Sequence, residues 1–350
     1  MEKVLGRENA EHAQTRNSLK SVVALALCFG AIHFNLAFIL FSLFFLPLSL
    51  SPWVIAFLML FTVLPVDKNS LLGLKLSRFI CKHVCTYFPI TLHVEDAEAF
   101  HLNRSYGKKE LISPFPYQPF WSLDEGCSKF NLYIRIRMFF CYEPHSVFPF
   151  GSFALHNNTG FMRIPKIRFL VSSAAFYIPF LRQIWTWLGF SSVTKQNVIS
   201  LLASGYSCII VPGGTRETLF MEHGCENVYL KERRGFVRLA MEMGHPLVPV
   251  FCFGQTNIYK WWKAPGKLIQ SIARSMKIFP LIFWGRFGTP VPFKNPLYVV
   301  VGRPIQLEKT PQPTSDQVAK VHSEFIEALQ DLFERHKVQA GYENLELKIV

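Results

Sequence analysis

The longest apolar stretch of the chain lies near its start. No Asp, Glu, Lys or Arg occurs from Ser21 to Val66. As a single helix this stretch would be about 69 Å long at ~1.5 Å per residue, whereas one membrane crossing needs only ~20 residues. Residues 47–52 contain two prolines and two serines, which interrupt helices. The pattern therefore predicts two apolar helices, within 21–66, joined by a turn at 47–52 as a hairpin in a membrane.

Basic residues flank this hairpin on both sides. They are Lys3, Arg7, Arg16 and Lys20 before it and Lys68, Lys75, Arg78 and Lys82 after it. Because basic flanks stay on the cytoplasmic side of a membrane, we expect both ends of the hairpin, and both chain termini, in the cytosol. A cleaved signal peptide has an apolar part of only ~7–15 residues, so the length argues against one. A hairpin that dips into the membrane without crossing it is an open alternative.

Beyond the hairpin, residues 67–89 mix basic and apolar side chains at helical spacing, with Leu72, Leu76, Phe79 and Ile80 on one face. This pattern is typical of a helix that lies on an anionic membrane surface. Residues 164–190 are apolar but contain three basic residues and two prolines. We expect this segment to form a hydrophobic tunnel wall or an interfacial helix, with Trp185 and Trp187 at the level of lipid headgroups.

In the rest of the chain short apolar runs alternate with helical patterns, which favours an α/β fold. We expect four domains or segments: a tail at 1–20, the hairpin at 21–66, the interfacial segment at 67–89 and an α/β domain at 90–350. The expected strands are Ile90–Val94, Ser207–Val211, Leu247–Phe253 and Leu297–Val301, and the expected helices are Gln196–Ala203, Arg234–Met243 and Thr314–Lys337. Thr314 and Gln317 form a capping-box pair at the start of the last helix.

Composition narrows the class of protein. Of 350 residues, 50% are hydrophobic and only 17% are charged, which excludes a disordered chain. The net charge of +13 together with the apolar content indicates a membrane surface as partner, and no nucleic acid. The eight cysteines form no disulfide framework. Cys81, His83 and Cys85 do not share one helical face, so we expect no metal.

The first candidate for chemistry is His145, within the sequence CYEPHS that starts at Cys141. It follows an apolar run and precedes a Pro-Phe-Gly turn, so its imidazole can meet a bound hydroxyl group at the end of a strand. The near-neutral pKa of histidine suits a general base. A histidine that is hydrogen-bonded in a loop for structural reasons is the alternative.

The second candidate is the turn Val211–Glu217, which follows a predicted strand. Gly213 and Gly214 allow backbone N–H groups to face an anion, Arg216 adds a cationic fork, and Glu217 could orient an imidazole. The spacing matches neither a Walker loop nor a dinucleotide fingerprint, and a plain turn is the alternative.

A third cluster is basic and lies at the start of the helix that follows. It contains Lys231, Arg233, Arg234 and Arg238. Such a cluster is either a solvated helix face or a site for the phosphates of a bulky anionic cofactor.

These clusters belong to a longer set of motifs that resembles the type-2 diacylglycerol acyltransferase family, in its plant form. The resemblance covers nearly the whole chain except about 107–138. The matching pieces are YEPHS (142–146), IPFLRQIWTWLG (178–189), SGYSCIIVPGG (204–214), RRGFVRLAMEMGHPLVPVFCFGQ (233–255), YKWW (259–262), FWGRFG (283–288), VVVGRPI (299–305) and ALQDLFERHK (328–337).

The resemblance implies a glycerolipid-acyltransferase-like mixed sheet and a multi-pass enzyme of the endoplasmic-reticulum membrane. Its substrates would be diacylglycerol and acyl-CoA, the latter a co-substrate, with no permanently bound cofactor. Lipid droplets and a second copy of the chain are further partners that it leaves open. The family's Pro-His pair falls on Pro144 and His145. Many relatives have His in place of Glu143 and Gly in place of Ser146, so Glu143 is not expected to be indispensable.

The remaining site residues also follow from the resemblance. The family's Gly-Gly-x-x-Glu falls on Gly213, Gly214 and Glu217, and its Arg-x-Gly-Phe falls on Arg233, Gly235 and Phe236, with Arg234 between them. We expect His145 to deprotonate the acceptor hydroxyl for direct attack on the thioester, and the amides of Gly213 and Gly214 to hold the oxyanion.

Two departures from the family leave alternatives open. Residues 107–138 form an insertion, or translated intron sequence, directly before the histidine motif, and could leave a catalytically dead lipid-binding protein. Arg216 stands where relatives carry less charged residues, which keeps lysophosphatidate in view as an acceptor beside monoacylglycerol and a long-chain alcohol.

Overall fold

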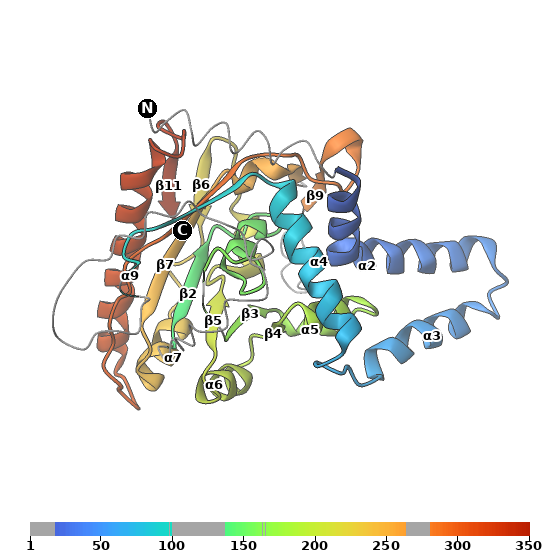
Figure 1. Ribbon diagram of the computed structural model, residues 1–350, viewed down its shortest axis with the longest axis horizontal. Coiled ribbons are helices and arrows are strands. Elements are labelled where there is room, and N and C mark those ends of the chain that lie inside the picture. The colour runs from blue at the N-terminus through green and yellow to red at the C-terminus, as the bar shows by residue number, and fades with distance from the viewer. Residues whose placement is uncertain (1–17, 98, 100–136, 163, 165, 264–280) are drawn as a thin grey trace, which may run out of the picture.

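A seven-stranded mixed sheet forms the centre of the molecule (Figure 1). The computed structural model describes residues 18–97, 99, 137–162, 164, 166–263 and 281–350, so the predicted tail up to residue 17 and insertion residues 107–136 lie outside the described residues. In spatial order the strands are β1 (Ile90–Val94), β10 (Leu297–Val301), β7 (Leu247–Phe253), β2 (Phe139–Glu143), β5 (Ser207–Ile210), β3 (Ile167–Val171) and β4 (Phe190–Ser192).

Only one pairing in this sheet is antiparallel, between β10 and β7. The two central strands β2 and β7 are buried along their whole length, because helices cover both faces of the sheet. The mixed α/β fold that the sequence predicts is confirmed. All four expected strands are present, although β5 ends at Ile210 instead of Val211.

One face of the sheet packs against α6 (Lys195–Ala203), α7 (Gly235–Met243) and α9 (Ser315–Lys337). These are the three helices expected from their spacing, and the capping box of Thr314 and Gln317 is formed at the start of α9. The other face packs against α4 (Leu71–Tyr87), α5 (Leu181–Trp187) and the short helix η3 (Phe150–Leu155). The site described below lies where strand ends meet these two layers.

Two apolar helices precede the sheet, α2 (Ser18–Phe45) and α3 (Ser51–Val63). The helix α3 begins at Ser51, within the predicted turn at 47–52. Pro52 lies in its first turn, where a missing N–H is tolerated. The helix ends at Val63 because the residue before Pro65 disfavours helical backbone. Among the described residues, Leu19–Phe45 is the one helical segment long and apolar enough to cross a membrane, while α3 has 13 residues.

The two halves of α2 have different surroundings. The first half lies beside α4 and buries Ala24, Leu25 and Cys28 in the core. The second half and α3 project away from the body of the molecule as a V (Figure 1). Polar side chains of α5 hold the end of α3: Arg182 donates to the carbonyls of Thr62 and Leu64, and Gln183 donates to Phe61.

The helix α4 lies within the predicted segment 67–89, and its residues have mixed surroundings. Of the predicted apolar face, Leu72 is exposed, Leu76 and Phe79 are partly buried and Ile80 is buried. The other buried positions are Gly73, Ser77, Cys81, His83, Val84, Cys85 and Tyr87. A Cβ atom on Gly73 would lie 2.4 Å from Trp187 Cδ1, so the packing of α4 against α5 requires glycine there.

Residues 164–190 do not form a single interfacial helix, which is one of the two interpretations of the sequence. The segment contains β3, the short helix η4 (Ser173–Tyr177), α5 and the start of β4. Trp185 is buried and donates from Nε1 to the carbonyl of Cys28 at 2.9 Å. This tryptophan therefore joins α5 to α2 within the protein and does not stand at a headgroup level.

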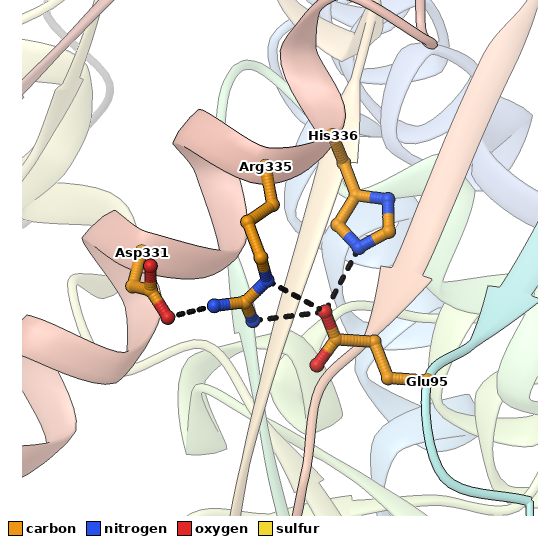
Figure 2. Close-up of polar contacts among 4 residues, drawn as sticks. All are labelled: Glu95, Asp331, Arg335 and His336. Atoms are coloured by element: carbon orange, nitrogen blue, oxygen red, sulfur yellow. Dashed lines mark hydrogen bonds and ion pairs between the residues drawn. The ribbon is translucent and has the colours of Figure 1, made fainter.

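Two small two-stranded sheets accompany the central sheet, and a charged contact joins the end of β1 to α9. Strands β6 (Cys225–Val228) and β11 (Glu346–Ile349) pair as a small parallel sheet, and β8 (Lys260–Lys263) pairs with β9 (Leu281–Trp284). Figure 2 shows Glu95, which follows β1, accepting from Arg335 at 2.8 Å and His336 at 2.9 Å. Burial raises the pKa of Glu95, but these hydrogen bonds outweigh it and lower the pKa overall.

Candidate functional site

His145 lies just beyond the carboxyl end of β2, at the centre of the sheet. In the sheet, β2 lies between β5 and β7. After β2 the chain re-enters the sheet at β3, on the β5 side, whereas after β7 it re-enters at β10, on the opposite side. Ligand sites of α/β proteins are commonly found at the carboxyl ends of parallel strands at such a switch point. His145 is half-buried there, and the preceding Glu143–Pro144 peptide bond is cis.

The imidazole of His145 is oriented by the backbone of the next residue. Its Nδ1 lies 2.8 Å from the carbonyl oxygen of Ser146, which can only accept a hydrogen bond. Nδ1 therefore carries the proton, and Nε2 carries the lone pair. Burial lowers the pKa of His145, although the bond to Ser146 acts in the opposite direction. A neutral imidazole with a basic Nε2 is the form that a general base requires.

Glu217 does not take the imidazole-orienting part predicted for it. It lies in the short helix η5 (Gly214–Leu219) and is buried. Its Oε1 accepts from the backbone N–H of His145 at 2.5 Å, and its Oε2 accepts from the backbone N–H of Tyr229 at 3.2 Å. Burial raises the pKa of Glu217 to about 7. Glu217 thus holds the main chain of His145, and the Ser146 carbonyl holds the ring.

The amides of Gly213 and Gly214 do not fit the predicted oxyanion role either. The N–H of Gly213 donates to Glu143 Oε1 at 2.9 Å, and the N–H of Gly214 donates to the carbonyl of Val211 at 3.1 Å. The N–H groups of Gly213 and Gly214 are therefore already paired within the protein, as expected because a buried unpaired N–H group is costly. The turn is therefore a structural support beside the histidine.

Glu143 is the second buried carboxyl group of this site. It is fully buried at the end of β2, and its carboxyl group lies within hydrogen-bonding reach of that of Glu217. Burial raises the pKa of Glu143 well above its usual range, and the neighbouring charge of Glu217 raises it further. The resemblance suggested a dispensable side chain, whereas the structure gives this carboxyl group contacts with two parts of the site.

Gln255 is a site residue that the motif analysis did not single out. Its buried amide donates from Nε2 to the carbonyl of Pro144 at 2.6 Å. Its Oε1 accepts from the hydroxyl of Tyr142 and from the N–H of Gly151 at 3.0 Å. In the sequence it appears only as the last residue of the motif 233–255. Its role could not be predicted there, because its partners come from distant segments. Gln255 fixes both ends of the loop that carries His145.

A pocket of about 420 Å³ lies next to the Pro212 turn, between α6 and α7. Arg233, half-buried, donates from Nε to the carbonyl of Pro212 at 2.7 Å. The lining is apolar at its base and charged at its rim; its charged members are Lys195, Glu232, Arg233, Arg234, Arg238 and Glu242. Four cations against two carboxylates leave the rim positive, which suits an anionic ligand.

The remaining predicted residues lie around this pocket and turn. Phe236 is buried, lines the pocket and packs against Phe325 of α9 with ring centroids 5.1 Å apart. Gly235 and Arg234 are exposed at the start of α7, and Arg216 is exposed on η5. Ser146 is buried, and its hydroxyl lies 3.5 Å from the carbonyl of Gln255. Arg216 is thus not part of the pocket rim.

On its other side the histidine loop reaches the apolar helices. Phe148, three residues after His145, contacts Phe29 of α2 with ring centroids 4.7 Å apart and Phe283 of β9 at 5.6 Å. Phe29 also contacts Phe150 of η3 and Trp185 of α5. An aromatic layer therefore connects the site to the helices that project from the molecule. Within the described residues no group of three or more metal-ligating side chains gathers.

Fold and site together define a mixed α/β protein with a neutral histidine at the switch point of its sheet, between an apolar helical projection and a basic pocket. The model of the diacylglycerol acyltransferase family matches residues 128–349, more than half of the chain. The chain belongs to this family.

Two relatives found by sequence agree with that assignment. Diacylglycerol O-acyltransferase 2 of Dictyostelium discoideum is 36% identical over 216 residues, which cover 57% of this chain and 65% of that protein. Acyl-CoA wax alcohol acyltransferase 2 of Homo sapiens is 34% identical over 228 residues, covering 59% of this chain and 68% of that protein. The matched part thus spans about two thirds of these relatives. The crystal structure of a 1-acyl-sn-glycerophosphate acyltransferase of Thermotoga maritima has a TM-score of 0.39 and 14% identity, over 87% of this chain and 97% of that one.

Proposed function

We propose that the protein transfers an acyl group from acyl-CoA to the free hydroxyl of diacylglycerol, forming triacylglycerol and free coenzyme A. The observation that carries the proposal is the contact of His145 Nδ1 with the Ser146 carbonyl, which assigns the lone pair to Nε2 at the switch point of the sheet. Family membership supports the reaction class. The aromatic contacts of Phe148 with α2 favour an acceptor that arrives from a membrane.

In the proposed mechanism His145 Nε2 takes the proton of the acceptor hydroxyl while the oxygen attacks the thioester carbonyl carbon. The tetrahedral intermediate collapses with cleavage of the C–S bond. The leaving thiolate receives the proton from the imidazolium, which restores the neutral ring. One general base is enough for this step because the thioester is already activated, and such a base typically contributes ~10²- to 10⁴-fold.

Acyl-CoA is proposed to bind with its phosphates at the positive rim of the α6–α7 pocket. Arg233 connects this rim to the Pro212 turn, and the Pro212 turn adjoins Glu143 and His145 through Gly213. The nucleotide end of acyl-CoA and its thioester would therefore lie on adjacent sides of the Pro212 turn. The projecting helices α2 and α3 are proposed to lie in the endoplasmic-reticulum membrane with both chain termini in the cytosol.

The test replaces the proposed base. We expect His145→Gln to reduce triacylglycerol formation by at least about 100-fold, since the general base is lost while the volume is nearly kept. Microsomes or detergent-purified protein are assayed with labelled acyl-CoA and diacylglycerol. Protein amounts are equalised by immunoblot.

His223→Gln is the matched control, because His223 is exposed and its ring stacks on that of Trp261 in β8. Near-normal turnover of His145→Gln would overturn the assignment of the base. A panel with monoacylglycerol, a long-chain alcohol and lysophosphatidate decides the acceptor: faster ester formation with any of them would replace diacylglycerol, and no product with all of them would indicate a lipid-binding protein without this activity.

A further inference from the structure

We propose that Glu143 and Glu217 share one proton, carried by Glu143, and that this pair is a positioning device that holds His145 against the Gly213 turn. Neither carboxyl group is assigned to the proton transfers of the proposed mechanism. The pair comes from two segments about seventy residues apart, β2 and η5. The proposal rests on the proposed function only where enzyme turnover is the measurement.

The geometry gives the two carboxyl groups unequal surroundings. Both oxygens of Glu217 accept hydrogen bonds from backbone N–H groups, of His145 and of Tyr229. On Glu143, Oε1 accepts from the N–H of Gly213, while no donor among the described residues reaches Oε2, although that atom is buried. Glu217 is therefore surrounded as an anion, and Glu143 is not.

A proton on Glu143 removes this imbalance. A protonated Oε2 becomes a donor toward the adjacent carboxylate of Glu217, which satisfies the buried atom and removes the repulsion between two charges. A buried pair of carboxyl groups in contact cannot ionise twice without a large cost. The directions of the two pKa values, both raised first by burial, agree with one shared proton near neutral pH.

The groups that face the pair are few. Within the described residues they come from four segments. They are Cys141 and Tyr142 of β2, His145 after β2, Glu226 of β6, and Arg233 before α7. Arg233 is the cation that acts on Glu143, and it lowers the pKa of Glu143 less than burial and Glu217 raise it. One positive charge nearby matches a pair with a single negative charge.

The consequence is a chain of contacts across the site. The N–H of Gly213 donates to Glu143, the protonated Glu143 would donate to Glu217, and Glu217 accepts from the N–H of His145. A Cβ atom on Gly213 would lie 2.3 Å from Glu217 Oε2, so the turn and the pair are in tight contact. Loss of the shared proton would place two like charges inside this chain and would displace His145.

The test compares amide replacements of the two members. A glutamine at 143 can accept from Gly213 and donate to Glu217, as a protonated glutamate does, so Glu143→Gln should keep turnover within about threefold of wild type. A glutamine at 217 has one acceptor oxygen where two N–H groups need acceptors, so Glu217→Gln should lose at least about tenfold in kcat. Glu143→Ala, which removes both contacts, should also lose about tenfold or more.

The pH profile separates positioning from plain packing. Wild-type kcat should fall at alkaline pH as the shared proton leaves, and Glu143→Gln should abolish this fall. Glu226→Gln, a buried glutamate outside the chain of contacts, is the control and should keep both the rate and the alkaline fall. The proposal is overturned if Glu217→Gln is the better tolerated of the two, or if Glu143→Gln keeps the alkaline fall.

An infrared measurement tests the pair without turnover. In the Glu226→Gln background, near pH 7, the carbonyl stretch of a protonated carboxyl group should be present, and it should be absent when Glu143→Gln is added. If this band is present but no acceptor is acylated, the proposed function fails and the pair stands. If the band is absent from the Glu226→Gln protein, the pair fails whatever the activity.

Discussion

At the scale of single residues, three glutamates are buried near the site, and each has a different set of partners. Glu143 and Glu217 contact each other and the turn that flanks His145. Glu226, on β6, is 2% exposed and accepts from the hydroxyl of Thr256 at 2.5 Å. Burial raises the pKa of Glu226 to about 8. Carboxyl groups kept neutral by burial make the stability of the fold depend on pH.

For Glu226 the sign of this dependence is set by its raised pKa. Its contribution to stability is complete below the ordinary pKa of 4.5, decreases as the pH rises, and is lost above about pH 8. Glu226→Gln keeps an acceptor for Thr256 but cannot ionise. We expect it to equal the wild type below pH 4.5 and to exceed it by about 1 kcal/mol or more above pH 8, measured by chemical unfolding of the detergent-solubilised protein. Equal stabilities of the two proteins at pH 9 would contradict the buried neutral carboxyl.

At the scale of elements, the binding features come from the packing of α6 and α7 on the sheet. Lys195 at the start of α6 pairs with Glu242 of α7 at 2.8 Å, and both line the pocket. The exposed Arg234, directly before α7, lines it as well. Cationic side chains from two elements thus face one opening, which neither helix would provide alone.

If the pocket binds the nucleotide of acyl-CoA, a change at its rim should affect binding of the nucleotide and not of the acyl chain. Arg234→Ala should raise the KM for a long-chain acyl-CoA by about three- to tenfold with kcat within about twofold, because it removes binding and not chemistry. With acyl-pantetheine, which lacks the nucleotide, the same variant should behave as wild type. Lys320→Ala, an exposed lysine on α9, is the matched control. An equal change in KM for both acyl donors would place the nucleotide elsewhere.

At the scale of the whole molecule, exposed apolar side chains concentrate on one projection, formed by the second half of α2 and by α3 (Figure 1). Phe45, Leu48 and Trp53 at its tip are 75%, 80% and 74% exposed. The first half of α2, in contrast, is part of the core. Exposed apolar side chains gathered in this way are typical of an interaction surface, and we expect this one to contact a membrane. The exposed apolar part and the buried part divide within a single helix.

Charges at the tip should release the protein from membranes without unfolding it. We expect the triple variant Phe45→Glu, Leu48→Glu, Trp53→Glu to lose most of its binding to phospholipid vesicles, since charged residues cost about 2.5–3.5 kcal/mol each at the centre of a membrane. Its near-ultraviolet circular dichroism should remain that of the wild type. Val338→Glu, also exposed but at the end of α9, is the control. Undiminished vesicle binding of the triple variant would show that the projection is not the membrane contact.

Local patterns predicted much of the fold correctly. The bounds of β1, β7 and β10, the three helices α6, α7 and α9, and the capping box of Thr314 follow from side-chain spacing and turn residues that lie close together in sequence. The same patterns did not predict β3, η4 and α5 within residues 164–190, nor which positions of α4 are buried. The buried positions depend on which helix packs opposite, as Gly73 against Trp187 shows, and periodicity within one segment does not contain that information.

For the site, the sequence by itself determined which residues are candidates: His145, the Gly213 turn and the basic start of α7 stand out by residue type and spacing. Only the tertiary structure decided what each one contacts. Glu217 meets the backbone of His145 and not its ring, Gly213 meets Glu143, and Gln255 joins the loop from more than a hundred residues away. Hydrogen-bond partners and burial are properties of segments brought together by the fold, and they set the proton positions that a linear pattern leaves open.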